Sequence, residues 1–80
     1  MEFSIPPTWE EFDQTQRLIA RFETDGDVTG LQDLQATISQ TEVECNRNRF
    51  DRESRTLGEL HRLVMQSVVA ITKPTGSRLY

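Results

Sequence analysis

Apolar side chains recur at three- and four-residue steps in three separate segments of this 80-residue chain, a periodicity typical of helices with one buried face. Glycine and proline lie between or beside the segments, at residues 6–7, 24–27 and 73–76, where they favour turns. The sequence therefore predicts an all-α fold. The three apolar stripes consist of Trp9, Phe12, Ile19 and Phe22, then Leu31, Leu34, Ile38 and Cys45, and finally Leu57, Leu60, Val64, Val68 and Ile71.

Helix-start and helix-stop signals give the expected bounds. Thr8 and Glu11 have the spacing of a capping box, a weaker box begins at Thr29 and a third box begins at Thr56. The second helix is expected to start at Asp27 or Thr29. Gly26 stands where a left-handed residue would end the first helix. We therefore expect a single helical domain over residues 1–80, with helices at about 8–24, 28–46 and 56–72 and a tail at 73–80.

Residues 46–56 leave two architectures open, because they hold one strong hydrophobe, Phe50, among mixed charges. As a loop, they would complete a small three-helix bundle. As an exposed helical stretch, they would give a helical hairpin with a long second helix, running from about 28 to 72. The first helix is too short to cover such a hairpin, so another chain would be needed. We favour a break between about Asn46 and Ser54.

The chain is short and its core is thin, since hydrophobic residues make up 35% of it. Domains of this size often recruit a disulfide, a metal or a partner chain. Cys45 is the one cysteine and His61 the one histidine, which leaves no intramolecular disulfide and no Cys/His metal cluster. We therefore expect no cofactor, a protein partner that is either a second copy or a foreign protein, and a cytoplasmic location. No stretch approaches the roughly 18 apolar residues of a membrane span, so no membrane partner is expected.

The charge of the chain is unevenly distributed. Residues 1–44 carry ten acids and two arginines, net −8, whereas residues 45–80 carry seven bases and three acids, net +4. Halves of opposite sign attract each other, which favours an antiparallel fold or head-to-tail association between chains. Five of the bases gather within sixteen residues: Arg47, Arg49, Arg52, Arg55 and Arg62.

Two alternative functions follow from this distribution. The arginine cluster, with asparagines interleaved, suits contacts with phosphates and base edges, and residues 54–57 resemble the start of a helix-turn-helix recognition segment. Nucleic acid is nevertheless disfavoured, because the chain is acidic overall and Asp51, Glu53 and Glu59 interrupt the cluster. The spaced carboxylates of the first half suggest the opposite role, a mimic of DNA that occupies a nucleic-acid-binding protein.

We do not expect an enzyme. His61 has no positioned nucleophile or carboxylate, since the neighbouring Glu59 points elsewhere on a helix. Arg47 and Arg49 could lower the pKa of the Cys45 thiol, but a buried cysteine on the apolar stripe is the favoured interpretation. The sequence contains no phosphate-binding loop, metal-ligand spacing or nucleophile elbow.

The third apolar stripe is the widest, which indicates a helix that touches more than one neighbour and suits docking to a partner. We therefore predict a non-enzymatic protein–protein interaction module, such as a small adaptor, chaperone-like or regulatory subunit, with an apolar helix face and a charged rim. The predicted partner-binding residues are Leu60, Val64, Met65 and Val68 on the face and Arg47, Arg49, Arg52 and Arg55 on the rim.

Residues 31–39 and 63–69, with the acidic turn before Leu31, resemble the helical-hairpin needle and rod subunits of type III secretion systems. This resemblance implies a helical hairpin and a place in a secretion apparatus. The arginine-rich middle of the chain, the short first helix and the tail after Ile71 depart from the pattern.

Overall fold

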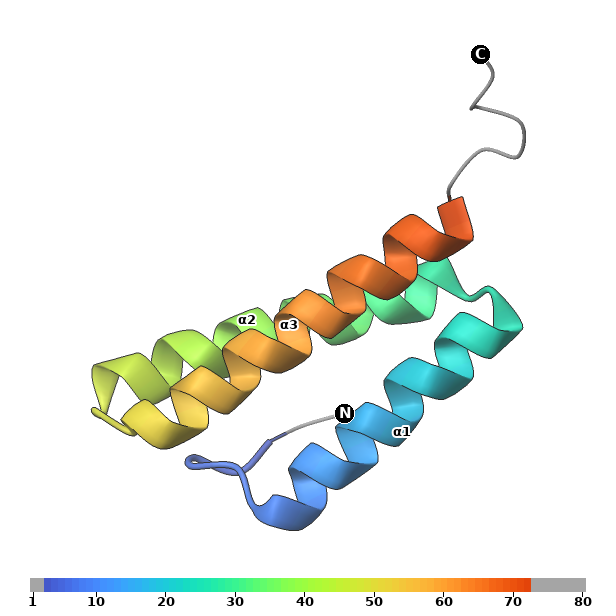
Figure 1. Cartoon of the computed structure of the whole chain (residues 1–80). Coiled ribbons are helices and arrows are strands. Elements are labelled where there is room, and N and C mark those ends of the chain that lie inside the picture. Colours follow the sequence, from blue (N-terminus) through green and yellow to red (C-terminus); the bar gives the residue numbers. More distant parts are fainter. Residues whose placement is uncertain (1–2, 73–80) are drawn as a thin grey trace.

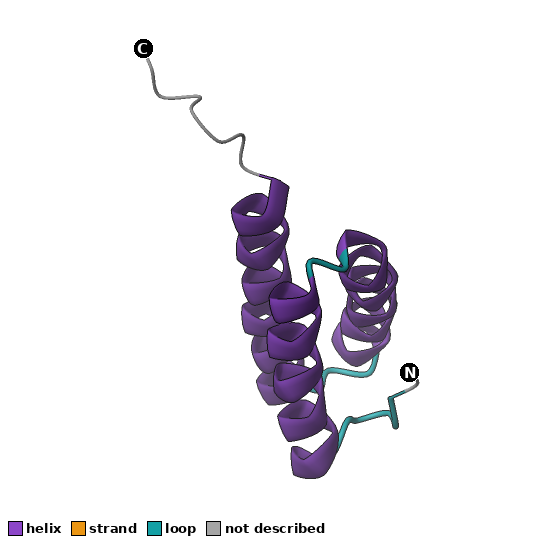
Figure 2. Cartoon of the chain, turned by 90° about the vertical axis from the view of Figure 1, so that its right-hand side faces the viewer, coloured by secondary structure: helices purple, strands orange, loops and turns teal. Residues whose placement is uncertain are grey.

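The computed structural model describes residues 3–72, which form the helices α1 (Trp9–Asp25), α2 (Val28–Arg47) and α3 (Asp51–Thr72). α2 and α3 lie side by side and antiparallel, and α1 lies alongside them, antiparallel to α2 (Figure 1 and Figure 2). No strand occurs in residues 3–72. The predicted all-α three-helix bundle is confirmed. The alternative of one long helix from about 28 to 72 is wrong, because the chain turns back at residues 48–50. The expected tail at 73–80 lies outside the described residues.

α1 begins and ends where local sequence signals place it. The Glu11 N–H donates to Thr8 Oγ1 at 3.2 Å and the Thr8 N–H donates to Glu11 Oε1 at 2.8 Å, so the predicted capping box forms. At the other end, Gly26 has a φ of 69°, a left-handed conformation that costs glycine little. The Asp27 N–H then donates to the Phe22 carbonyl at 2.9 Å, which closes the helix.

The Glu11 carboxylate also ties the segment before α1 to the helix. The Ser4 N–H donates to Glu11 Oε2 at 3.0 Å, and the Ser4 hydroxyl donates to the same oxygen at 3.3 Å. The backbone hydrogen bond from Thr8, followed by those from Ser4, lowers the pKa of Glu11 from its ordinary value of 4.5. The ionised form of Glu11 therefore stabilises the start of α1.

We expect Glu11→Ala to cost about 1 kcal/mol of folding free energy near neutral pH, a typical value for a lost cap. Because the folded-state pKa of Glu11 is lowered, its contribution is fully present above pH 4.5 and is lost as pH falls through the folded-state value. The difference in Tm between the parent chain and Glu11→Ala should therefore shrink from about pH 7 to about pH 3, as followed by circular dichroism. Glu11→Gln keeps the acceptor oxygen without the charge, so its Tm difference from Glu11→Ala should stay constant. A difference between parent and Glu11→Ala that persists in acid would contradict this role of the charge.

α2 begins at Val28 with Asp27 as its N-cap, since the Gly30 N–H donates to Asp27 Oδ1 at 2.9 Å. The capping box predicted at Thr29 is therefore wrong, because Thr29 already lies within the first turn. Asp27 directly follows the left-handed Gly26 and is the first residue with a side-chain acceptor after the turn. Its carboxylate also suits the positive end of the helix dipole.

The break between α2 and α3 is short and is made without glycine. α2 extends to Arg47. Arg49 adopts the left-handed conformation with a φ of 63°, which residues other than glycine and asparagine rarely adopt. The Phe50 N–H donates to the Cys45 carbonyl at 2.8 Å, so the helix end closes as it does after α1. Only residues 48–50 are non-helical, and the predicted loop over 46–56 is wrong in its extent.

α3 begins at Asp51, five residues before the expected start at 56. The Ser54 N–H donates to the Phe50 carbonyl at 2.9 Å, which starts the helix. Thr56 lies within α3, where its hydroxyl donates to the Arg52 carbonyl at 3.1 Å, so the predicted helix start at Thr56 is wrong. Phe50, which directly precedes the helix, is partly buried and packs against the core.

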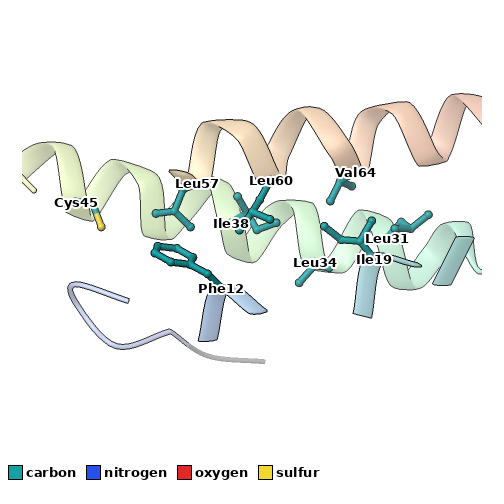
Figure 3. Packing of buried hydrophobic residues seen from close by; sticks show 9 residues of the cluster. All are labelled: Phe12, Ile19, Leu31, Leu34, Ile38, Cys45, Leu57, Leu60 and Val64. Carbon is teal, nitrogen blue, oxygen red and sulfur yellow. The ribbon is translucent and has the colours of Figure 1, made fainter. Parts of the chain in front are cut away.

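The core lies where the apolar stripes of the three helices meet (Figure 3), and the contact between α2 and α3 is the most extensive. No buried side-chain nitrogen or oxygen in residues 3–72 lacks a hydrogen-bond partner. The nine buried hydrophobic residues are Phe12, Ile19, Leu31, Leu34, Ile38, Cys45, Leu57, Leu60 and Val64. None of the described helices is long and apolar enough to cross a lipid bilayer.

Candidate functional site

The apolar residues predicted to bind a partner are divided between the core and the surface. Leu60 is 1% exposed and Val64 is fully buried, so both belong to the chain's own core. Val68 is partly buried against the same core. Of these four residues only Met65 is exposed, with 45% of its surface accessible. Three of the four predicted apolar residues therefore pack within the chain itself.

His61 bridges α3 to α2 through hydrogen bonds. The Gln35 side-chain nitrogen lies 3.3 Å from His61 Nε2 and donates to Met65 Sδ at 3.2 Å, and Ser39 Oγ lies 3.3 Å from His61 Nδ1. Both nitrogens of the His61 ring are thus engaged by side chains of α2.

The Cys45 thiol is fully buried at the C-terminal part of α2. Burial raises the pKa of Cys45 above its ordinary value, and the carboxylates of Glu53, Glu42 and Glu44 raise it further. The lowering by Arg47 and Arg49 considered from the sequence does not occur. A buried thiol with a raised pKa is poorly suited to act as a nucleophile.

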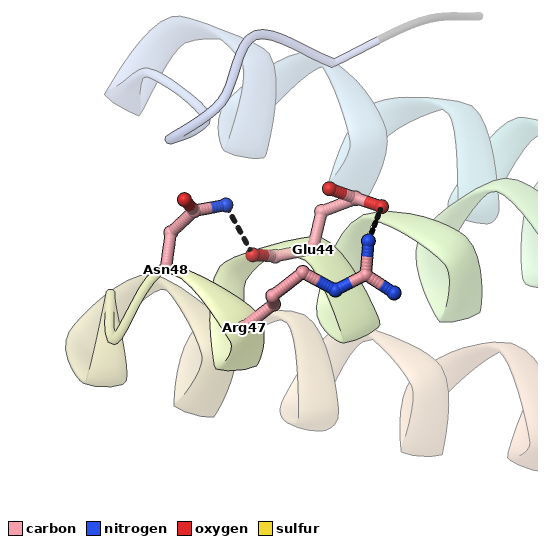
Figure 4. A network of polar contacts seen from close by, with 3 residues as sticks. All are labelled: Glu44, Arg47 and Asn48. Atoms are coloured by element: carbon pink, nitrogen blue, oxygen red, sulfur yellow. Dashed lines mark hydrogen bonds and ion pairs between the residues drawn. The ribbon is translucent and has the colours of Figure 1, made fainter.

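The four predicted rim arginines, Arg47, Arg49, Arg52 and Arg55, are all exposed at the end of the bundle where α2 turns into α3. Arg47 Nη1 pairs with Glu44 Oε1 at 3.3 Å, and the Asn48 side chain donates to the Glu44 carbonyl at 2.8 Å (Figure 4). Asp51 and Glu53 stand among the arginines in the first turn of α3. This end therefore carries mixed charge rather than one basic face.

A groove follows the seam between α1 and α3. Three hollows of about 390, 350 and 420 Å³ lie along it. The first two share Trp9, Phe12 and Thr56, and the first and third share Gln16. We call this surface the α1–α3 groove, and it is lined by Pro7, Trp9, Glu10, Phe12, Asp13, Gln16, Ile19, Ala20 and Glu23 on one side and by Arg52, Glu53, Thr56, Leu63, Gln66, Ser67 and Ala70 on the other.

The α1–α3 groove has an apolar floor and two exposed apolar side chains. Phe12 and Ile19 form the floor and are 7% and 5% exposed. Trp9 is 83% exposed at one end of the groove, and its ring meets that of Phe12 edge to face with centroids 6.4 Å apart. Leu63, 40% exposed, lies in the third hollow. The groove thus has a buried apolar floor and, beside it, apolar side chains that are exposed to solvent.

Carboxylates outnumber cations along the groove. Glu10, Asp13 and Glu23 line its α1 side, whereas Glu53 and Arg52 line its α3 side. The Ser67 hydroxyl donates to Glu23 Oε1 at 2.6 Å, a hydrogen bond that joins the two walls. Asp13 also pairs with Arg17 within α1, Oδ2 to Nη2 at 3.1 Å, but both side chains are largely exposed, so this pair leaves the acidic character of the groove in place.

The sequence places Trp9 on the apolar stripe of the first helix, as a buried or partner-facing residue, and Leu63 did not enter the predicted site. Helical geometry contained a signal for both residues. At about 100° per residue, Trp9 lies about 60° from Phe12 and Leu63 lies about 60° from Leu60 around the helix axis. Each residue is therefore at the edge of its stripe, where exposure depends on how closely the neighbouring helix approaches.

Within residues 3–72, no three His, Cys, Asp or Glu side chains are grouped so that they could hold a metal ion. Comparisons with protein-family models, curated proteins and solved structures give no match for this chain. Residues 3–72 of this chain form a small all-α three-helix bundle.

Proposed function

We propose that this chain is a non-enzymatic protein–protein interaction module, a small adaptor, chaperone-like or regulatory subunit, that binds its partner in the α1–α3 groove. The observation that carries the proposal is Trp9, a tryptophan with 83% of its surface exposed beside an apolar floor. Tryptophan is enriched among the residues that dominate binding energies, and contiguous exposed apolar surface marks interaction sites. Leu63 supplies a second apolar contact further along the groove.

The buried residues of α3 support this surface from inside. Leu60 and Val64 hold α3 in the bundle, while Leu63 faces the groove. A protein partner suits the charges better than nucleic acid, because acidic side chains line the groove and interrupt the arginines at the α2–α3 turn. The proposed location remains the cytoplasm, since the single cysteine makes no intrachain disulfide.

Site-specific photocrosslinking in the cells that make the protein tests this proposal. Gln16 is exposed and lines two of the three hollows, so a photoreactive benzoylphenylalanine at this position should form an adduct with one defined protein, identified by mass spectrometry. The matched control carries the same residue in place of Gln40, an exposed glutamine on α2 outside the groove, and should give no such adduct. Equal adducts from both positions, or none from Gln16, would contradict the proposal.

A further inference from the structure

The α1–α3 groove has the dimensions of a site for one helix. Its α1 wall runs from Trp9 to Glu23, which corresponds to about 21 Å of helix at 1.5 Å per residue. A groove between two helices accepts the apolar stripe of a third, with anchors at i, i+3 or i+4 and i+7. Ala20 and Ala70 line the third hollow, and because their side chains are short, an incoming backbone can approach closely there. An occupant of about four helical turns would fill the groove.

The charges of the groove select the chemistry of that helix. Four carboxylates, those of Glu10, Asp13, Glu23 and Glu53, line it against the single cation of Arg52. The half of the chain that contains α1 carries a net charge of −8. An apolar floor with acidic walls is complementary to a helix that has an apolar stripe flanked by lysine or arginine.

We propose, building on the interaction function above, that the occupant of the α1–α3 groove is a basic amphipathic helix of a partner protein. Its apolar stripe lies against Trp9, Phe12 and Leu63, and its cations face the carboxylates of the walls. A second copy of this chain fits less well. Its α1 and α2 are themselves acidic, and Leu57, Leu60 and Val64 of its α3 are buried in its own core.

The test uses two synthetic helical peptides of about four turns that share one leucine stripe and lack tryptophan. One peptide has lysine beside the stripe and the other has glutamate. Trp9 is the only tryptophan of the chain, so its fluorescence reports directly on the groove of the full-length protein. The lysine peptide should shift the emission to shorter wavelength and saturate, and the glutamate peptide should bind at least tenfold more weakly. Binding of the lysine peptide should weaken between about 0.1 and 1 M salt, where the Debye length falls from about 10 to 3 Å.

A matched pair of variants locates the binding. Ala20→Arg places bulk and positive charge in the groove and should weaken binding of the lysine peptide at least tenfold. Ala36→Arg makes the same change at an exposed site on α2 and should leave binding of this peptide unchanged. Equal binding of both peptides, lost in Ala20→Arg, would overturn the basic partner and leave the proposed function standing. Binding of neither peptide, with light scattering showing a dimer that Ala20→Arg dissociates, would assign the groove to a second copy. Binding of neither by a monomer would also overturn this inference, and the crosslinking at Gln16 then decides the proposed function separately.

Discussion

The Leu60→Ala variant is expected to lose about 3 kcal/mol of folding free energy, the lower end of the range for a fully buried leucine. Leu60 is 1% exposed and lies in the core between the helices, so the truncation removes apolar contacts and leaves a cavity. A chain of 80 residues has a total stability of about 4–12 kcal/mol, so this loss is a large fraction of it. Thermal unfolding followed by circular dichroism should show a Tm lower by about 12 °C or more.

Leu63→Ala is the matched control for this prediction. It makes the same change on the same helix, but Leu63 is 40% exposed, so the cost should stay below about 1 kcal/mol. The two variants should also differ in the opposite sense in binding, because Leu63 lines the α1–α3 groove and Leu60 does not. If Leu60→Ala kept the Tm of the parent chain but no longer bound the partner, Leu60 would belong to the binding face, as predicted from the sequence.

The Arg55→Pro variant is expected to lose about 3 kcal/mol or more of folding free energy. Arg55 is the fifth residue of α3 and is exposed, so the substitution removes no packing and acts through the backbone alone. Proline at this position lacks the N–H that would donate to the carbonyl four residues earlier, and its ring clashes with that carbonyl. Had residues 46–55 been a loop, the same change would cost little. Urea unfolding monitored by circular dichroism measures the difference.

Asp51→Pro provides the control for the backbone argument. Asp51 is the first residue of α3, and a proline there loses no intrahelical hydrogen bond and already has a helical φ. The free energy of unfolding of Asp51→Pro should remain within about 1 kcal/mol of that of the parent chain. Parent-like stability of Arg55→Pro would show that α3 begins later than Asp51, as the sequence indicated.

The start of α3 escaped prediction because its signals are not local ones. A turn is usually marked by glycine, whereas here Arg49 takes the left-handed conformation and the Phe50 N–H reaches back to Cys45. Thr56 and Glu59 match a capping box in sequence, yet a continuous helix runs through them. The choice between these possibilities depends on Phe50, which packs against the core.

The ends of α1 were predictable because a few neighbouring residues determine them. Thr8 and Glu11 satisfy each other's backbone N–H groups without help from the rest of the chain. Gly26 ends the helix because it adopts a left-handed conformation at little cost. At the start of α2 two cap candidates stood close together, and the geometry after Gly26 selected Asp27 over Thr29.

For the candidate site too, local sequence predicts the apolar stripes, whereas the exposure of individual residues depends on tertiary packing. Periodicity identified the apolar stripe of α3, but it could not show that Leu60 and Val64 are buried by the chain's own helices while Leu63 remains open. It also placed Trp9 with Phe12, although the structure buries one ring and exposes the other. These differences arise from small offsets around a helix axis, which matter only once a neighbouring helix is in place.

The all-α class and the apolar stripes follow from local sequence alone, because hydrogen bonding within each helix and the spacing of Leu31, Leu34 and Ile38 need no distant partner. Three other outcomes follow from tertiary packing: where α3 begins, which residues at the stripe edges stay exposed, and the presence of a groove between α1 and α3. Those outcomes depend on how closely three helices approach one another, a distance set by the packing of side chains far apart in the chain.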